Sequence, residues 1–186
     1  MSRFQGVLLA LAFVASCSPK ASTQSGESPR PTPTDKPLVE VPGVELPPPD
    51  PREAALSAVI LKLLEGEHLL HKSVDDTISK EAFTAFVERL DAGKMFLLKT
   101  DREAMAKYAD KVDDELRSGS LDLAHEGAKR YAARVAVVEK MVTALLAQPM
   151  DFSNEETVEV DAEKIDLAAD EDELKDRWRK RLELEV

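Results

Sequence analysis

The chain has 186 residues and a formal net charge of −11 at neutral pH. This length corresponds to about one domain. The charge argues against a nucleic-acid partner, because phosphate contacts need clustered basic residues and here Lys and Arg are interleaved with Asp and Glu. We therefore expect an acidic, well-solvated surface and no nucleic acid among the partners.

The N-terminus has the features of a bacterial export signal. Arg3 is followed by the apolar run 7–14, and two small residues then precede Cys17, the one cysteine of the sequence. The apolar run is too short to span a bilayer permanently. Residues 14–17 (VASC) resemble a lipobox, in which the cysteine is acylated and becomes the first residue. We therefore expect a lipoprotein signal peptide over residues 1–16, and the alternative is an ordinary signal with an incidental cysteine.

A lipid on Cys17 implies attachment to the bacterial cell envelope, with the membrane as a partner. An exported cysteine without a disulfide partner needs an explanation, and acylation provides one. Several acyl chains on one residue hold a protein stably on a membrane. Ser18 stands where some bacteria read an aspartate as an inner-membrane retention signal. We therefore expect the outer membrane, with the protein facing the periplasm.

The acylated cysteine and a Pro-rich linker make up residues 17–51. Ten of the eleven prolines lie between Pro19 and Pro51, and no aromatic residue occurs between Phe13 and Phe83. Burial in such a segment could not offset the entropy lost on ordering it, so we expect a disordered tether. Its prolines favour extended conformations that space a domain from the membrane. The alternative is a Pro-rich ligand for a partner domain.

Residues 52–186 carry the helical signals, and we expect an all-α fold, an irregular antiparallel helical bundle. The first helix should begin at Asp50-Pro51, with Glu53 completing a capping box. It should continue towards Leu70. Its apolar stripe, which we expect to face the core, consists of Leu56, Val59, Ile60, Leu63 and Leu64.

Two helices should follow. One should start at Ser79, with Ile78 and Phe83 as a hydrophobic staple, and end near Gly93. The other should start at the capping box 100–103 and run unbroken to Gly119. Their expected inner faces consist of Phe83, Phe86, Val87 and Leu90 in the first, and Met105, Tyr108, Ala109, Val112 and Leu116 in the second.

A long fourth helix should run from about Asp122 to Leu146. Its apolar stripe comprises Ala128, Tyr131, Val135, Val138, Val142 and Leu145. Residues 157–160 are β-branched enough to be extended, without an obvious strand to pair with. The last helix should begin at Asp170 with Glu173 as its capping-box partner, and should bury Leu174 and Trp178.

The sequence contains no credible active site, cofactor site or metal centre. His68 and His71 would share a helix face, but zinc enzymes usually need a third ligand, and His125 lies on another helix. There is no Gly-x-Ser-x-Gly nucleophile motif, and no lysine or histidine is tied to Ser153 by spacing. We therefore expect no catalytic residue, no cofactor and no metal ligand.

Two acidic runs have simpler interpretations. Residues 113–115 (DDE) are predicted to be a solvated helix face. Residues 170–173 (DEDE) suit the first turn of a helix, where the helix dipole stabilises negative charge.

Several segments, in order along the chain, resemble the N-terminal helical domain of the tail-specific (carboxy-terminal processing) protease family. They are the D-x-x-x-S motif at 75–79, the aromatic pair with Leu90-Asp91, the apolar segment 95–98 leading to Thr100-Asp101, the block 114–122, and residues 149–152 with 170–178. The resemblance covers roughly residues 53–182. It departs from the family at 92–94, where a proline often follows Leu-Asp, and at 165–169, which lack the usual Pro-Trp character.

The resemblance implies a non-catalytic role. In full members a Ser/Lys dyad in a later domain cleaves proteins from exposed apolar C-termini, and a PDZ domain helps to recognise them. The helical domain frames the substrate enclosure and, in some bacteria, contributes to docking of a tetratricopeptide lipoprotein adaptor. No position of this chain matches the dyad. The chain therefore resembles part of a serine peptidase, and alone it is expected to be inactive.

We expect this chain to be such an N-terminal domain, truncated or split before the PDZ and peptidase domains. Its expected partners are the missing protease domains, a tetratricopeptide adaptor or another protein. The alternative is a stand-alone envelope lipoprotein that acts as a binding or scaffold module. Residues 178–186 contain no glycine or proline stop, so we expect Leu182, Leu184 and Val186 to be exposed and to contact a partner.

We predict that Cys17 is the lipid-modified first residue of the mature protein. Mass spectrometry of protein extracted from its native membranes should find an acylated peptide that begins at Cys17. Cys17→Ala should release the chain from membranes or leave an unprocessed precursor, because the acyl chains provide the anchor. An unmodified thiol, or cleavage at another residue, would contradict the prediction.

Overall fold

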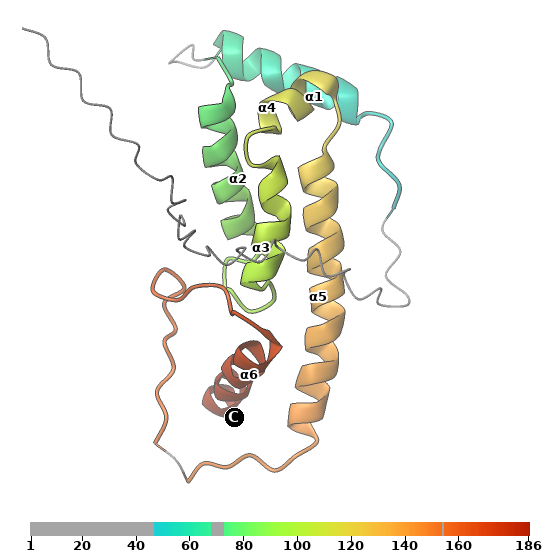
Figure 1. Cartoon of the computed structure of the whole chain (residues 1–186). Coiled ribbons are helices and arrows are strands. Elements are labelled where there is room, and N and C mark those ends of the chain that lie inside the picture. Colours follow the sequence, from blue (N-terminus) through green and yellow to red (C-terminus); the bar gives the residue numbers. More distant parts are fainter. Residues whose placement is uncertain (1–46, 68–72, 154) are drawn as a thin grey trace, which may run out of the picture. The chain divides into compact units, whose positions relative to one another are not determined.

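A computed structural model describes residues 47–67, 73–153 and 155–186 of the chain (Figure 1). Residues 1–46, which include the expected signal peptide, Cys17 and most of the linker, lie outside the described residues, as do His68 and His71. The helices are α1 (Glu53–Lys62), a π-helical turn (Leu63–Glu67), α2 (Asp76–Leu90), α3 (Lys99–Met105), a 3₁₀ turn (Ala106–Tyr108), α4 (Val112–Ser118), α5 (Asp122–Leu146) and α6 (Glu171–Glu185).

The all-α fold expected from the sequence is confirmed for the described residues. The chain runs along α2, returns through α3 and α4, and reverses again along α5 (Figure 1). An isolated parallel bridge between Leu98 and Ala168 ties the segment before α3 to the segment before α6. Residues 157–160 belong to no regular element.

Two adjoining groups of buried side chains form the core. The first joins α2, α3 and the start of α5 and contains Phe83, Val87, Leu97, Met105, Leu123 and Leu167. The second joins the middle of α5 to α6 and contains Leu98, Val138, Ala168 and Leu174. Leu97 and Leu98 are consecutive and point into different groups, so this short extended segment links the two halves of the core.

Helix α2 begins three residues earlier than predicted. The side chain of Asp75 accepts hydrogen bonds from the N–H groups of Thr77 and Ile78, at 2.9 and 3.1 Å, and the helix starts at Asp76. The predicted start at Ser79 was wrong because Asp75, in an extended conformation, is itself a good N-cap. The Ser79 hydroxyl is instead buried and donates to Asp113 Oδ1 at 2.8 Å.

The predicted continuous helix from 100 to 119 is wrong, because it is divided into α3, the 3₁₀ turn and α4. The start of α4 is held by a residue of α2: the Asp113 N–H, in the first turn of α4, donates to the Ser79 hydroxyl at 3.0 Å. At the other end, α3 starts at Lys99 rather than after Thr100, since the Leu98 N–H donates to the Asp101 carboxylate. The predicted stop at Gly119 is confirmed, with φ of 76°.

Helix α5 has the predicted bounds, and its predicted stripe is confirmed in part: Val138 is buried, and Tyr131 and Val142 pack against the core. Its buried residues are Leu123, Gly127, Arg130 and Val138. Ala128 and Val135, which were predicted to face the core, are exposed. A Cβ on Gly127 would stand 2.5 Å from the Phe86 ring, so glycine is required where α2 and α5 approach each other. The apolar pattern therefore did not predict that Gly127 and Arg130 are buried.

Helix α6 agrees with its prediction. The Asp170 carboxylate accepts from the Glu173 N–H, and the Glu173 carboxylate accepts from the Ala169 N–H, both at 2.9 Å. Leu174 is fully buried, while Trp178 is half-buried and donates its indole N–H to the Met95 carbonyl at 2.7 Å. At the C-terminal end of the helix, Leu184 and Val186 are exposed as expected, but Leu182 is half-buried.

Helix α1 contradicts its prediction most strongly. The large side chains of its apolar stripe are exposed, and the buried residue is Ser57. A Cβ on Gly119 would stand 2.6 Å from Ala54, which shows how closely α1 approaches the end of α4. The predicted capping box is half present: the Glu53 carboxylate accepts from the Asp50 N–H, whereas Asp50 caps Arg52. Ala54, Ser57 and the half-buried Leu61 therefore lie on the contact side of α1.

Asp101 is the centre of a buried ion-pair cluster between α3, α5 and α6. It is 1% exposed and accepts from Arg134 Nε at 2.7 Å, while Arg130 Nη1 lies 3.6 Å away. Arg134 also forms an ion pair with Glu171, at the N-terminus of α6, with Nη1 and Oε1 3.0 Å apart. The cluster therefore connects the three helices through charged groups.

Asp113 and Glu115 are also buried, although residues 113–115 were predicted to form a solvated helix face. Asp113 pairs with Arg117, whose guanidinium also donates to the Val74 carbonyl. The Glu115 carboxylate accepts from the Leu123 N–H at 3.1 Å, one of the free donors at the start of α5. Burial raises the pKa of Glu115, and this hydrogen bond partly opposes the rise. Both acids therefore connect α4 to other parts of the domain.

Replacing Asp101 by alanine should lower the free energy of unfolding by roughly 3–5 kcal/mol, because Arg130 and Arg134 would lose the buried carboxylate that they share. Glu171→Ala is the matched control, because Glu171 is the other carboxylate paired with Arg134 but its side chain is 56% exposed. This substitution should cost under about 1 kcal/mol. Urea unfolding followed by circular dichroism measures both. Equal losses for the two variants would contradict the assignment.

The stability should also depend on pH through Asp113. Burial alone would raise its pKa, but hydrogen bonds from Ser79 and Arg117 outweigh burial and hold the pKa below its usual value. A carboxyl with a lowered folded-state pKa stabilises the fold above its unfolded pKa, about 3.9, and loses that contribution as the pH falls through its folded pKa. Asp113→Asn should therefore cost about 1–3 kcal/mol at neutral pH and make the loss of stability below about pH 4 shallower.

The control for this prediction is Asp114→Asn, because Asp114 is exposed on the same turn. It should leave the pH dependence of the unfolding free energy unchanged. Urea denaturation repeated between neutral and acidic pH measures both variants. Parallel curves for Asp113→Asn and the unmodified chain would contradict a role of Asp113 in acid stability.

Candidate functional site

The segments that resemble tail-specific proteases contain carboxylates that shape the backbone. Asp91, in the Leu-Asp motif, is buried and accepts from the N–H groups of Met95, Phe96 and Leu97 at 3.0, 2.9 and 2.8 Å. These bonds satisfy three donors in the turn that leads to α3. Asp75 and Asp101 have comparable capping roles at α2 and α3. The acidic residues of these motifs therefore fix the local backbone geometry.

His125 belongs to a helix contact. Its Nε2 lies 2.9 Å from Glu53 Oε2, so the pair connects α5 to the first turn of α1. The hydrogen bond with His125, supported by the Asp50 N–H, holds the pKa of Glu53 below its usual value. Across residues 47–67, 73–153 and 155–186 there is no group of three or more His, Cys, Asp or Glu side chains that could hold a metal ion.

Ser153 lies in an exposed loop after α5. Its N–H donates to Asp151 Oδ1 at 2.9 Å. Hydrogen bonding to the side chain and backbone of Ser153 lowers the pKa of Asp151. A carboxylate with a lowered pKa is a weaker base, so this contact does not activate the hydroxyl as a nucleophile.

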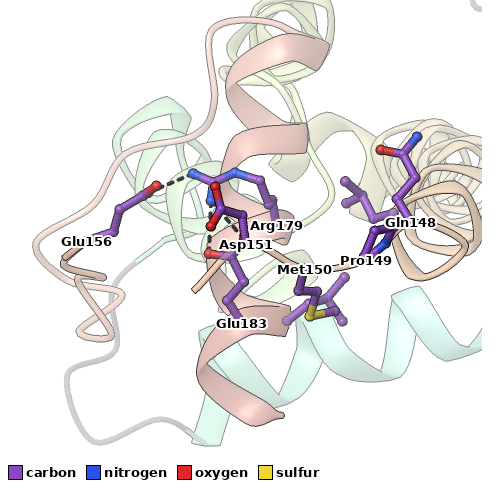
Figure 2. Close-up of a pocket in the computed structure, with 9 residues that line it drawn as sticks. Gln148, Pro149, Met150, Asp151, Glu156, Arg179 and Glu183 are labelled. Carbon is purple, nitrogen blue, oxygen red and sulfur yellow. Dashed lines mark hydrogen bonds and ion pairs between the residues drawn. The ribbon is translucent and has the colours of Figure 1, made fainter. Parts of the chain in front are cut away.

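The candidate site is a pocket of about 300 Å³ between the end of α5, the following loop and α6 (Figure 2). One wall is apolar and the other is charged. The lining residues are Leu145, Gln148, Pro149, Met150, Asp151, Glu156, Arg179, Leu182 and Glu183. We call this the α5–α6 pocket. Its volume suits one large side chain of a protein segment.

The charged wall of the α5–α6 pocket is organised by Arg179. The guanidinium donates to Glu156 at 2.7 Å and to Glu183 at 2.9 Å (Figure 2). It also donates to Asp176 at 2.8 Å. These partners raise the pKa of Arg179, and Arg179 in turn lowers the pKa of Glu156. The guanidinium is thus saturated by carboxylates of its own chain.

The electrostatics of the pocket disfavour a free carboxylate. Three acids, Asp151, Glu156 and Glu183, line it with one guanidinium, so its charge is negative. A C-terminal carboxylate would have to displace the partners of Arg179 and approach these acids. The arrangement instead suits an apolar side chain with a lysine or arginine nearby in the bound segment.

A second, shallower hollow of about 190 Å³ adjoins the α5–α6 pocket. The two share Asp151, Glu156 and Glu183. The second hollow adds the exposed apolar residues Phe152 and Leu184. The acidic wall is therefore flanked by apolar surface on both sides, which is typical of a protein interface.

Sequence reasoning did not identify this site. Residues 149–152 were noted as a family-like segment, and Leu182 and Leu184 as exposed apolar residues, but not as parts of one pocket. A usable signal was present in α6. Arg179 lies three residues after Asp176 and four residues before Glu183, and both are spacings of helical ion pairs. That spacing predicts an ion-pair row but not the loop that closes over it.

Among the described residues, no helix is both long enough and apolar enough to cross a membrane.

A family model for the tail specific protease N-terminal domain matches residues 60–186. The match extends over more than half of the chain and includes α2–α6, the buried Asp101 cluster and the α5–α6 pocket. The resemblance predicted from the sequence motifs is thereby confirmed. The chain belongs to the tail specific protease N-terminal domain family.

Proposed function

We propose that this chain is a non-catalytic docking module of a tail-specific protease, which holds a segment of a substrate or adaptor protein at the α5–α6 pocket. Family membership supports the assignment to a protease. The pocket, with one apolar and one acidic wall, is the observation that carries the docking role. In this proposal peptide-bond cleavage is performed by the dyad-bearing portion of the protease.

The pocket is suited to docking because the N-terminal half of α6 is attached to the core. Arg177 donates to the carbonyls of Lys94 and Asp166, at 2.6 and 3.0 Å. Trp178 donates to the Met95 carbonyl, and its ring packs edge-on against Phe96, with centroids 5.8 Å apart. The wall that presents Arg179 is thus positioned before a ligand arrives, which lowers the entropy lost on binding.

The chemistry of the pocket favours recognition of the body of a polypeptide over its terminus. Arg179 is already paired, so it offers little to a C-terminal carboxylate. The apolar wall of Leu145, Met150 and Leu182 can accept an aliphatic or aromatic side chain. An unfolded substrate presents such residues along its length, and an adaptor presents them on a folded surface.

The proposed site of action is the periplasmic side of the cell envelope. Acylation at Cys17 would anchor the chain, and the Pro-rich linker would separate the helical domain from the lipid surface. A tetratricopeptide lipoprotein adaptor is the class of partner that the family resemblance implies for this domain. Such an adaptor would be held on the same membrane, which raises its effective concentration.

Binding of a labelled, unstructured polypeptide with an apolar C-terminus tests the proposal. Fluorescence anisotropy with the full chain should show saturable binding. Leu182→Asp should weaken it at least about fivefold, because a carboxylate would replace part of the apolar wall; one lost apolar contact is worth about 1–3 kcal/mol. Amidation of the polypeptide's C-terminus should leave the affinity unchanged, since Arg179 is already neutralised.

Leu146→Asp is the matched control, because Leu146 is an exposed leucine in the last turn of α5 that does not line the pocket. It should bind like the unmodified chain, and circular dichroism should show that both variants remain helical. The same mixtures should show no cleavage of the polypeptide. Absence of binding, loss of binding on amidation, or cleavage that disappears on replacing a Ser or Lys of this chain would overturn the proposal.

A further inference from the structure

The outer face of α1 carries an apolar stripe that the described domain does not cover. Its five large side chains are between 39% and 57% exposed. They are Leu56, Val59, Ile60, Leu63 and Leu64. Single exposed apolar residues are ordinary, but a contiguous row along one helix marks an interface. We call this row the α1 stripe.

The orientation of α1 follows from the contacts that attach it to the rest of the domain. Ser57 is 1% exposed, and Ala54 lies against Gly119 where α1 meets α4. Glu53 is held by His125 at 2.9 Å, and Glu65 accepts from the Val74 N–H at 3.3 Å. These contacts fix both ends of the helical segment, so the α1 stripe faces away from the core.

The charges at the two ends of the stripe indicate what covers it. Arg52 precedes the stripe and Glu67 follows it, and both are exposed. Arg52 is the residue just before α1 and Glu67 is the last residue of the π-helical turn, so the two charges mark the two ends of the stripe. The face therefore reads, from N- to C-terminus, as a cation, an apolar row and an anion. Such a face is complementary to itself when reversed.

We propose that the α1 stripe pairs with the α1 stripe of a second copy of this chain, antiparallel and about a two-fold axis between Val59 and Ile60. In this register Leu56 of one copy opposes Leu63 of the other, and Arg52 opposes Glu67. Both charge pairs are then attractive. A parallel pairing would instead place Arg52 beside Arg52 and Glu67 beside Glu67, so charge selects the antiparallel arrangement.

The pairing is compatible with the contacts already present. Arg52 is paired with Asp50 at 2.6 Å, and its side chain is 81% exposed, so its remaining donors can reach a second carboxylate. The segment from Arg52 to Glu67 is about 20 Å long at about 1.5 Å per residue. A helix pair of this length buries less than the roughly 800 Å² per partner of a standard interface, so the dimer should depend on concentration. Anchoring on a shared membrane would favour it.

Cysteine cross-linking in intact cells tests both the dimer and its register. Every protein is the full chain with Cys17 retained, because an acylated thiol cannot form a disulfide and the membrane anchor is kept; the chain without an introduced cysteine is the control for cross-linking through Cys17. Val59→Cys should form a disulfide-linked dimer on mild oxidation, because position 59 lies beside the axis. Leu56→Cys alone should cross-link at least about fivefold less, since its two copies are displaced along the helices beyond the reach of a disulfide. Co-expressed Leu56→Cys and Leu63→Cys chains should cross-link to each other.

Leu146→Cys is the control for exposure, because Leu146 is as exposed as the stripe residues but lies on α5. It should stay monomeric. Arg52→Glu should reduce the cross-linking of Val59→Cys at least about fivefold, and the added Glu67→Arg should restore it. All these positions are exposed, so the substitutions should not prevent folding.

Several results would overturn the proposal. Val59→Cys that remains monomeric would exclude the dimer, and Leu56→Cys that self-links as well as Val59→Cys would indicate a parallel pair. Cross-links from position 59 to another protein would identify a different occupant. The polypeptide-binding assay at the α5–α6 pocket is independent of these outcomes, because no pocket residue is changed.

Discussion

The fold depends on one buried carboxylate, Asp101. It accepts the Leu98 N–H at the start of α3 and pairs with Arg134 from α5, which also contacts Glu171 at the start of α6. A charge removed from water at this position is tolerated only because it is fully paired. The consequence is geometric: α3, α5 and α6 meet at a common point, and α6 is placed where it forms a wall of the α5–α6 pocket.

Other buried carboxylates extend the same principle. Asp91 accepts hydrogen bonds from three backbone N–H groups before α3. Asp113 joins α2 to α4 through Ser79, and Glu115 caps the start of α5. Each satisfies donors that a helix end or turn would otherwise leave unpaired. A small domain with a divided apolar core thus obtains a defined arrangement from polar contacts. The same contacts explain why the family-like motifs are rich in Asp.

The sequence predicted the elements better than their orientation. The bounds of α5 and the cap of α6 are local properties, set by Gly119, Asp170 and neighbouring side chains, so they could be predicted correctly. The burial of Arg130 on α5 could not, because it depends on the partners Asp101 and Glu126. The prediction for the buried face of α1 was wrong for a related reason. Ser57 and Ala54 allow close packing against α4, and the α1 stripe then faces outwards. The pocket was missed because its walls come from separate segments, although the ion-pair spacing within α6 was visible.

The central claim is that a prearranged helical frame presents the α5–α6 pocket to a protein segment. Hydrogen exchange of the full chain, with and without the unstructured polypeptide, tests it most directly. The account predicts slow exchange at Leu97 and Leu98 in the free chain, because buried carboxylates accept these N–H groups, and new protection at residues 147–156 when the polypeptide is added. Protection of Leu97 and Leu98 that arises only with the polypeptide, or unchanged exchange at 147–156, would contradict it.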